Sequence, residues 1–326
     1  MTKRFEDLTK QTVAELDSSA AEEALAASCY WPKWDGPWWK MRLLHELGLT
    51  SAIPARALDA LTRSLNKMPF HIFPITPEEG EGIKNPFNDT GCHCQVGTMV
   101  SVLTAAQRHV RTEVPWMRRW LASYQMLDGG YNCDEGAYLV HNECPSSMVA
   151  TIAIFEALLA VGPEQWTEAE RGAAERMARF LVARRLTEGS ATTYNAIEQE
   201  EAKAWPLLCF PRFYHYDILR GLSALVRYAE LTGFEIPLQS VAPVFEQIER
   251  KADPATGALR VERQCFAEHR TVRRDAEGEW TGRGPAEEFP LLLAVSVIGG
   301  VCDPLTQEWR RTREAWTRLV GRQQCL

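Results

Sequence analysis

The 326-residue sequence predicts an all-α fold, an α/α toroid in which an inner ring of helices is enclosed by an outer ring. Two observations predict it. Helical periodicity dominates the chain, and segments that are apolar on all sides alternate with strongly amphipathic ones. A helix that is apolar all round must be surrounded by protein, whereas a helix with one charged face borders solvent. The alternation therefore predicts helical hairpins, each with one inner and one outer helix, in a single domain over residues 1–326.

The predicted inner helices are the segments that are apolar on nearly all sides: 38–49, 96–106, 148–161, 218–231 and 291–301. The predicted outer helices are the Arg- and Glu-rich amphipathic segments that follow them: 54–67, 114–125, 168–185, 238–251 and 304–320. A further helix over residues 5–27 adds an outer member, so the ring holds five or six hairpins. Gly48, Gly162 and Gly233 stand where helix C-caps are expected, which supports these boundaries.

The composition excludes some classes of function. A net charge of −7 and a pI near 5.6 argue against a nucleic-acid partner, because phosphate binding needs a basic surface. The N-terminal segment lacks the apolar core of a signal peptide, and no later segment is long and apolar enough to span a membrane. We therefore expect a cytoplasmic protein, in which the nine cysteines are thiols or metal ligands rather than disulfides.

In a toroid, the N-terminal ends of the inner helices meet at one rim, so residues at these ends become neighbours in space. Thiols, an imidazole and carboxylates gather at these positions in the sequence. Thiolate and imidazole are the preferred ligands of zinc, and a helix N-terminus lowers the pKa of a thiol. The pattern therefore predicts a zinc site at the rim, with one coordination position open if the ion is catalytic.

Two short segments resemble a known superfamily. Residues 125–133, QMLDGGYNC, resemble the repeat signature of prenyltransferases and squalene cyclases, with Tyr131 where tryptophan is usual. Residues 213–223, FYHYDILRGLS, resemble the part of protein prenyltransferase β-subunits where a zinc-binding histidine opens an inner helix. The chain is thus similar to the terpenoid cyclase and protein prenyltransferase superfamily of α/α toroids. The resemblance implies that His215 binds zinc.

The sequence also departs from both branches of this superfamily. Protein prenyltransferases carry an aspartate two residues before a zinc-binding cysteine, and here Asn142 precedes Cys144 in that position. The aspartate-rich acid motif of the squalene cyclases, D-x-D-D, does not occur in the chain. These departures argue against both protein prenylation and polyene cyclisation driven by protonation.

Cys144 and His215 are the first candidate zinc ligands, because they occupy the positions that the resemblance marks. Cys133 and Cys94 are the further candidates, since they flank the starts of inner helices. Cys92 and Cys94, two residues apart, would point to the same side only if the chain is extended just before the helix. The alternative is that these thiols are buried and inert and that His215 is a hydrogen-bonded core residue.

Carboxylates and aromatic rings complete the predicted site. Asp35, Asp134 and Asp217 are candidate acids, bases or orienting partners of a metal ligand, or else ordinary helix-start charges. Aromatic rings can hold an apolar substrate and stabilise a cation formed from it. The candidate substrate-binding rings are Trp34, Trp38, Tyr131 and Tyr214.

Three functions fit this pattern. The first is a zinc-dependent enzyme, a transferase or lyase acting on a small, largely apolar substrate, such as an isoprenoid, in the funnel of the toroid. The second is a metal-free lyase, isomerase or cyclase of isoprenoids, in which Asp35 or a glutamate of the funnel is the acid. The third is a module that binds an apolar ligand or a peptide without catalysis.

Overall fold

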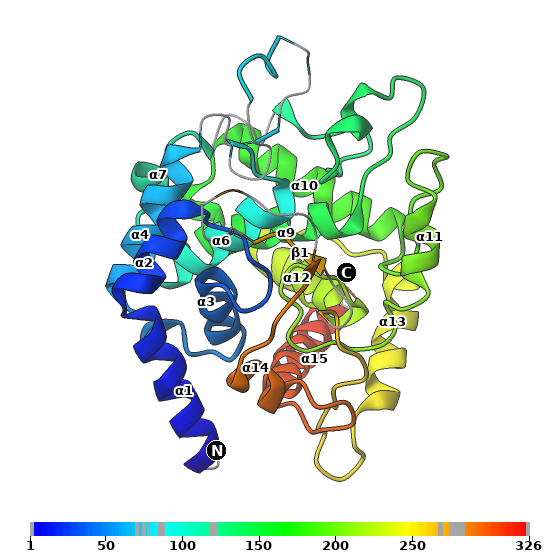
Figure 1. Cartoon of the computed structure of the whole chain (residues 1–326). Coiled ribbons are helices and arrows are strands. Elements are labelled where there is room, and N and C mark those ends of the chain that lie inside the picture. The colour runs from blue at the N-terminus through cyan, green and yellow to red at the C-terminus, as the bar shows by residue number, and fades with distance from the viewer. Residues whose placement is uncertain are drawn as a thin grey trace.

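The computed structural model describes residues 3–68, 72–73, 76, 78–83, 89–117, 121, 123–266, 270–273, 275, 279 and 284–323. Over these residues the chain is all-α, as predicted (Figure 1). Besides the helices, the same residues contain a pair of two-residue antiparallel strands, β1 (Arg270–Thr271) and β2 (Gly284–Pro285). Within the described part of the chain, no helix combines the length and the apolar character of a membrane span.

Four of the predicted inner segments form helices where the sequence places them. They are α3 (Pro37–Glu46), α6 (His93–Ala105), α9 (Met148–Val161) and α12 (Ile218–Thr232). Helix α6 packs along α9, α3 packs against α6, and α12 packs against α9. Because nearly every residue of α6 and α9 is buried, these two helices form the centre of the core (Figure 1).

The close packing of α6 on α9 depends on a glycine. A Cβ atom at Gly97 would lie 2.6 Å from the carbonyl carbon and oxygen of Ala153. Real Cβ atoms do not approach backbone atoms this closely, so only glycine lets the two helix backbones come together here. The contact fixes α6, and with it the residues that begin α6, against the centre of the core.

The amphipathic segments form the helices predicted for the outer layer. They are α4 (Ala55–Lys67), α10 (Glu168–Ala183), α13 (Leu238–Lys251) and α15 (Asp303–Gln323). Thr167 and Glu170 form a capping box at the start of α10, which explains why that helix begins where it does. The remaining predicted outer segment, 114–125, lies partly outside the described residues.

Shorter helices connect these elements. They are η1 (Thr50–Ala52), α7 (Val110–Glu113), η2 (Glu135–Leu139), η3 (Pro163–Gln165) and α11 (Ile197–Ala202). The predicted N-terminal helix is divided into α1 (Lys3–Leu16) and α2 (Ser19–Ala27). The break occurs at Ser18, whose side chain accepts a hydrogen bond from the backbone N–H of Ala21 at 3.1 Å and so starts a new helix.

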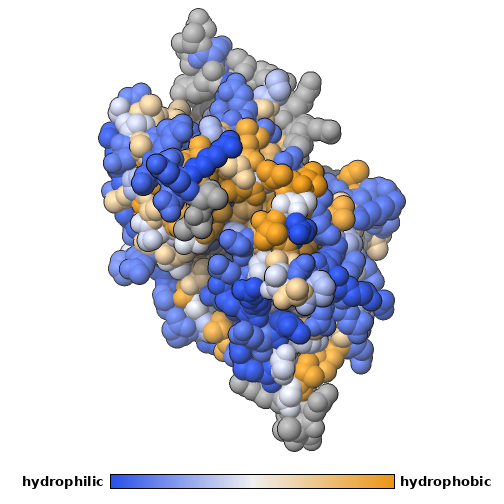
Figure 2. All heavy atoms as spheres, turned by 90° about the horizontal axis from the view of Figure 1, so that it is seen from below, coloured by the Kyte–Doolittle hydropathy of each residue, from blue (hydrophilic) through white to orange (hydrophobic). Residues whose placement is uncertain are grey.

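The fifth predicted inner helix, 291–301, is wrong in its length and in its burial. Helix α14 spans only Pro290–Val295 and packs against α1, with Leu291 and Leu292 buried. The chain then turns through Gly299, which has a φ of +81°. Val297, Ile298 and Val301 are more than half exposed instead of enclosed. Figure 2 shows hydrophobic residues at the surface of the lower face of the molecule, among largely hydrophilic ones.

Candidate metal centre

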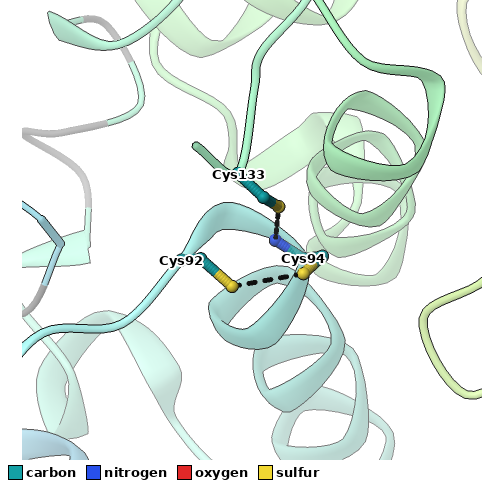
Figure 3. A group of neighbouring side chains, drawn as sticks. All are labelled: Cys92, Cys94 and Cys133. Carbon is teal, nitrogen blue, oxygen red and sulfur yellow. Dashed lines mark hydrogen bonds between the residues drawn. The ribbon is translucent and has the colours of Figure 1, made fainter. Parts of the chain in front are cut away.

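Three cysteines form a cluster at the start of helix α6. The Sγ atoms of Cys92, Cys94 and Cys133 all lie within 4.8 Å of one another (Figure 3). The Sγ atoms of Cys92 and Cys94 are 3.2 Å apart, and the backbone N–H of Cys94 donates to Cys133 Sγ at 3.2 Å. Among the described residues, this is the group of three or more His, Cys, Asp or Glu side chains whose ligand atoms lie close enough together to hold one metal ion.

The backbone at the N-cap of α6 brings Cys92 and Cys94 to the same side. Cys92 is the N-cap residue and is extended, with φ −123° and ψ 167°, whereas Cys94 lies in the first turn of the helix. Two side chains two residues apart within a helix diverge, but the change from extended to helical backbone between these residues removes that restriction. The two thiols of the sequence Cys-His-Cys are therefore neighbours in space only because helix α6 begins between them, at His93.

Cys133 is held in place by hydrogen bonds of the two residues that precede it. The backbone N–H of Ser147 donates to the carbonyl oxygen of Tyr131 at 2.7 Å, and the side-chain amide of Asn132 donates to the carbonyl oxygen of Pro145. Nδ1 of His93 lies 2.7 Å from the carbonyl oxygen of Asn132. These contacts anchor the loop to the start of both α6 and α9 and so position the third thiol.

The segment QMLDGGYNC, residues 125–133, forms the turn that leads to Cys133. The side-chain amide of Gln125 donates to the carbonyl oxygens of Gly129 and Ala173 at 2.9 and 3.0 Å. Asp128 accepts hydrogen bonds from the backbone N–H of Gly130 and the hydroxyl of Ser146 at 3.1 and 2.6 Å. The polar residues of this segment thus have a structural role, because they hold the turn before the cluster.

The three thiols perturb one another. Hydrogen bonds from Cys133 and Cys94 hold the pKa of Cys92 well below its ordinary value, despite burial. Burial raises the pKa of Cys133, and its hydrogen bonds to Cys92 and Cys94 raise it further. The cluster thus favours one thiolate and opposes a second. A bound cation would remove this opposition, because thiolate is the form that binds metals.

Lys33 and aromatic rings lie beside the cluster. The ammonium group of Lys33 donates to Tyr214 Oη at 2.9 Å and lies 4.7 Å from the centroid of that ring. It also lies 5.2 Å from the ring centroids of Tyr30 and Trp31 and 5.4 Å from that of Trp34. We call Lys33 and these four rings the lysine cage. Such cation–π contacts are stabilising, and most so where water is excluded.

The lysine cage is electrostatically linked to the thiols. Burial raises the pKa of Tyr214, and the negative charges of Cys94, Cys92 and Cys133 raise it further. The hydrogen bond from Cys133 lowers the pKa of Cys94, and the charge of Lys33 acts in the same direction, although burial and Cys92 raise it overall. The cage is therefore close enough to the sulfur atoms for each to alter the charge of the other.

The structure brings two of the four candidate zinc ligands together. Cys94 and Cys133 belong to the cluster, and Cys92 is the third member in place of the two first candidates. Cys144 is half-buried in the loop after η2 and is outside the group. His215 is also outside it; it lies in the turn before α12, where its ring stacks on that of Tyr214 with centroids 4.4 Å apart.

The three candidate carboxylates have structural partners. Asp217 is fully buried, caps α12 and forms an ion pair with Arg212 at 2.7 Å. Asp134 is exposed, caps η2 and accepts a hydrogen bond from the hydroxyl of Tyr194 at 2.8 Å. Asp35 forms an ion pair with Arg273 at 3.3 Å. The first two are therefore helix-start charges, which is the alternative that the sequence left open.

The candidate substrate-binding rings separate into two groups. Trp34 and Tyr214 belong to the lysine cage, and their ring centroids are 5.8 Å apart. Trp38 and Tyr131 are buried in the core, and the hydroxyl of Tyr131 donates to the carbonyl oxygen of Leu121 at 2.8 Å. Sequence reasoning did not single out Lys33, although its position between two tryptophans in WPKW is the signal that could have identified it.

Comparisons with protein-family models, with curated proteins and with solved structures found no match for this chain. Three features of the structure bear on function: the convergence of Cys92, Cys94 and Cys133, their position at the N-terminus of a buried helix, and the adjacent lysine cage.

Proposed function

We propose that the protein is a zinc-dependent enzyme, a transferase or lyase, whose metal ligands are Cys92, Cys94 and Cys133. The observation that carries this proposal is the approach of the three Sγ atoms to within 4.8 Å. With Zn–S bonds of about 2.3 Å, the sulfur atoms of a tetrahedral site lie about 3.8 Å apart. The Cys92–Cys94 separation of 3.2 Å needs only a small widening to fit. Three protein ligands are the usual number at catalytic zinc, whereas structural zinc has four.

The helical arrangement supports a toroid of the terpenoid cyclase and protein prenyltransferase kind as the scaffold. Helices α3, α6, α9 and α12 pack in that order, and an amphipathic helix follows α3, α9 and α12 in the chain. Helix α1 contacts both α3 and α14, so that the first and the last parts of the chain meet. The thiol cluster lies at the N-terminal end of an inner helix, where such a scaffold gathers its functional residues.

The lysine cage supports a small substrate with an apolar body and a polar atom. When bound, zinc activates a water, thiol or oxygen atom at its open position. The partly exposed ring of Tyr214, on which the buried ring of Trp34 stacks, offers apolar surface beside the thiols, and Lys33 provides one positive charge. Lys33 would orient the polar or anionic group of the substrate, while the rings exclude water from it.

Metal analysis of the purified protein tests the proposal. We expect about one zinc per chain in the wild type, and little in Cys92→Ser or Cys133→Ser. Cys144→Ser is the matched control, since it removes a half-buried thiol outside the cluster and should keep the zinc. Wild-type protein without zinc, or zinc that persists after both cluster substitutions, would refute the assignment of these ligands.

Turnover measurements separate the enzyme from the alternatives. A zinc enzyme should lose activity in chelator and regain it when zinc is added. A metal-free lyase, isomerase or cyclase would keep its activity in chelator and lose it in Asp35→Asn, but the pairing of Asp35 with Arg273 gives this alternative less support. An apolar ligand that co-purifies without any product formation would favour the binding module.

A further inference from the structure

A large cavity lined by both charged and apolar side chains lies at the other end of the central helices from the thiols. It has a volume of about 720 Å³ and is lined by the C-terminal parts of α3, α6 and α9 together with α12 and α15. Cys94 is at the start of α6, whereas Thr104 near its end faces the cavity. Ten helical residues span about 15 Å, so the cavity and the thiol cluster are separate places in the molecule.

Every carboxylate that lines this cavity is already paired with an arginine. Three of the pairs lie within the lining: Arg42 with Glu46 at 2.9 Å, Arg212 with Glu308 at 2.6 Å and Arg220 with Glu156 at 2.6 Å. The fourth carboxylate, Glu230, pairs at 2.7 Å with Arg318, which is outside the lining. The negative charges of the cavity are therefore neutralised within the protein.

The positive charges of the cavity are not all neutralised. Arg227 and Arg311 also line it, and neither forms an ion pair with a carboxylate of the described residues. Arg227 donates to the carbonyl oxygen of Leu159 at 3.0 Å. The side chains of Arg227 and Arg311 are both exposed. Partial desolvation lowers the pKa of Arg227; Glu156 raises it, and the charge of Arg311 lowers it. The two guanidinium groups are thus near enough to repel each other.

A third arginine of the lining has one nitrogen atom without a hydrogen-bond partner among the described residues. This arginine is Arg212, and the atom is its buried Nη2. Its other nitrogen atoms are held by Asp217 and Glu308 at 2.7 and 2.6 Å, so the side chain cannot turn away to satisfy Nη2. Because Nη2 is buried, a ligand in the cavity does not reach this donor, and Arg227 and Arg311 are the arginines that can contact an anion there.

We propose that this cavity binds a small ligand with an oxyanion group on an apolar body, and that Arg227 and Arg311 bind the oxyanion. Guanidinium groups match the geometry of phosphate and carboxylate oxygens, which they bind through paired N–H donors. Leu47, Leu159 and Leu305 line the same cavity and provide apolar surface for the rest of the ligand. The volume is in the range of sites for small molecules.

The helix dipoles set a limit on this site. The C-terminal ends of α3, α6 and α9 carry partial negative charge toward the cavity, which disfavours an anion. This effect decays within the last turn of each helix. Because Arg227 lies within α12 and Arg311 within α15, we place the oxyanion beside these two helices rather than at the three helix ends.

Calorimetric titration at constant ionic strength tests the proposal with three probes that share an aromatic ring. Phenyl phosphate and benzoate carry the two kinds of oxyanion, and benzyl alcohol is neutral. We expect the wild type to bind an anionic probe more tightly than benzyl alcohol. Stronger binding of phenyl phosphate assigns the natural ligand to phosphate esters, and stronger binding of benzoate assigns it to carboxylates.

Substitutions in the cavity give the second part of the test. Arg227→Gln and Arg311→Gln should each weaken binding of the anionic probe about tenfold or more, as expected for loss of one charge-assisted contact. Arg310→Gln is the matched control, because Arg310 is an exposed neighbour on α15 outside the lining and should bind as the wild type does. Equal binding by all four proteins, or no preference for an anion, would overturn the proposal.

Discussion

Arg220 on α12 and Glu156 on α9 form a bidentate ion pair, with N–O distances of 2.9 and 2.6 Å. Arg220 is 1% exposed, so its charge depends on this carboxylate rather than on water. The pair joins two helices of the core at the wall of the cavity lined by Arg227 and Arg311. Because a buried charge is costly without its partner, this contact is a sensitive point for the stability of the fold.

Glu156→Gln should destabilise the protein by about 3 kcal/mol or more, since it leaves the buried guanidinium of Arg220 without a counter-charge. The free energy of unfolding in urea measures the effect. Glu188→Gln is the matched control, because the pair of Arg185 and Glu188 is exposed and should contribute less than about 0.5 kcal/mol. Equal stability of the two variants would contradict the buried pair.

Substitutions at two helix glycines should have opposite effects on stability. Gly97→Ala should cost about 1–3 kcal/mol, because its Cβ atom would meet the backbone of Ala153. Gly172→Ala on α10 should instead stabilise the protein by about 0.5–1 kcal/mol, since its Cβ atom meets only the flexible end of Arg176. Thermal and urea unfolding of both variants would show the difference in sign.

His45 predicts a dependence of stability on pH. Burial lowers the pKa of His45 to about 3, with the charge of Arg42 acting in the same direction. The unfolded state, with a histidine pKa near 6.5, takes up a proton on acidification before the folded state does. This residue therefore stabilises the fold above about pH 6.5, and its contribution falls by up to about 1.4 kcal/mol per pH unit toward pH 3.

Urea unfolding between pH 7 and pH 4 measures the contribution of His45. In His45→Gln the stability should fall less steeply with acidification than in the wild type, because a titrating group has been removed. His141→Gln is the control, since His141 is exposed. If the free energy of unfolding falls equally steeply with acidification in the wild type and in His45→Gln, His45 is not buried in its neutral form.

The short helix α14 predicts a contrast between residues that are close together in the sequence. Leu292→Ala should cost about 2–5 kcal/mol, because Leu292 is fully buried. Ile298→Ser should change the stability by less than about 0.5 kcal/mol, since Ile298 is 60% exposed. A large loss of stability in Ile298→Ser would instead support the longer, buried helix that the sequence predicts.

Much of the fold could be predicted because burial leaves a mark on the sequence of each helix. The segment 148–161 is apolar on all sides and is helical over the same residues in α9. The pattern failed at residues 291–301, which are equally apolar. There, Ser296 ends the helix and Gly299 turns the chain, so local backbone geometry prevails over the hydrophobic pattern.

The site could be predicted only in part, because spacing along the chain does not show which loops touch. Cys94 and Cys133 were candidates, since both flank the starts of buried helices. Cys92 depends on where α6 begins, and helix boundaries are the least certain part of any sequence-based prediction. Lys33 and Tyr214 are 181 residues apart, so only tertiary packing brings them together.

Three sulfur atoms so close together have a consequence for handling the protein. Without a metal or a reducing agent, neighbouring thiols are each other's nearest partners when air oxidises them. Such oxidation joins sulfur atoms two at a time, and the Sγ atoms of Cys92 and Cys94, for example, are only 3.2 Å apart. A sample aged in air should therefore keep one titratable thiol of the three, and its capacity to take up zinc should decline in step with that loss.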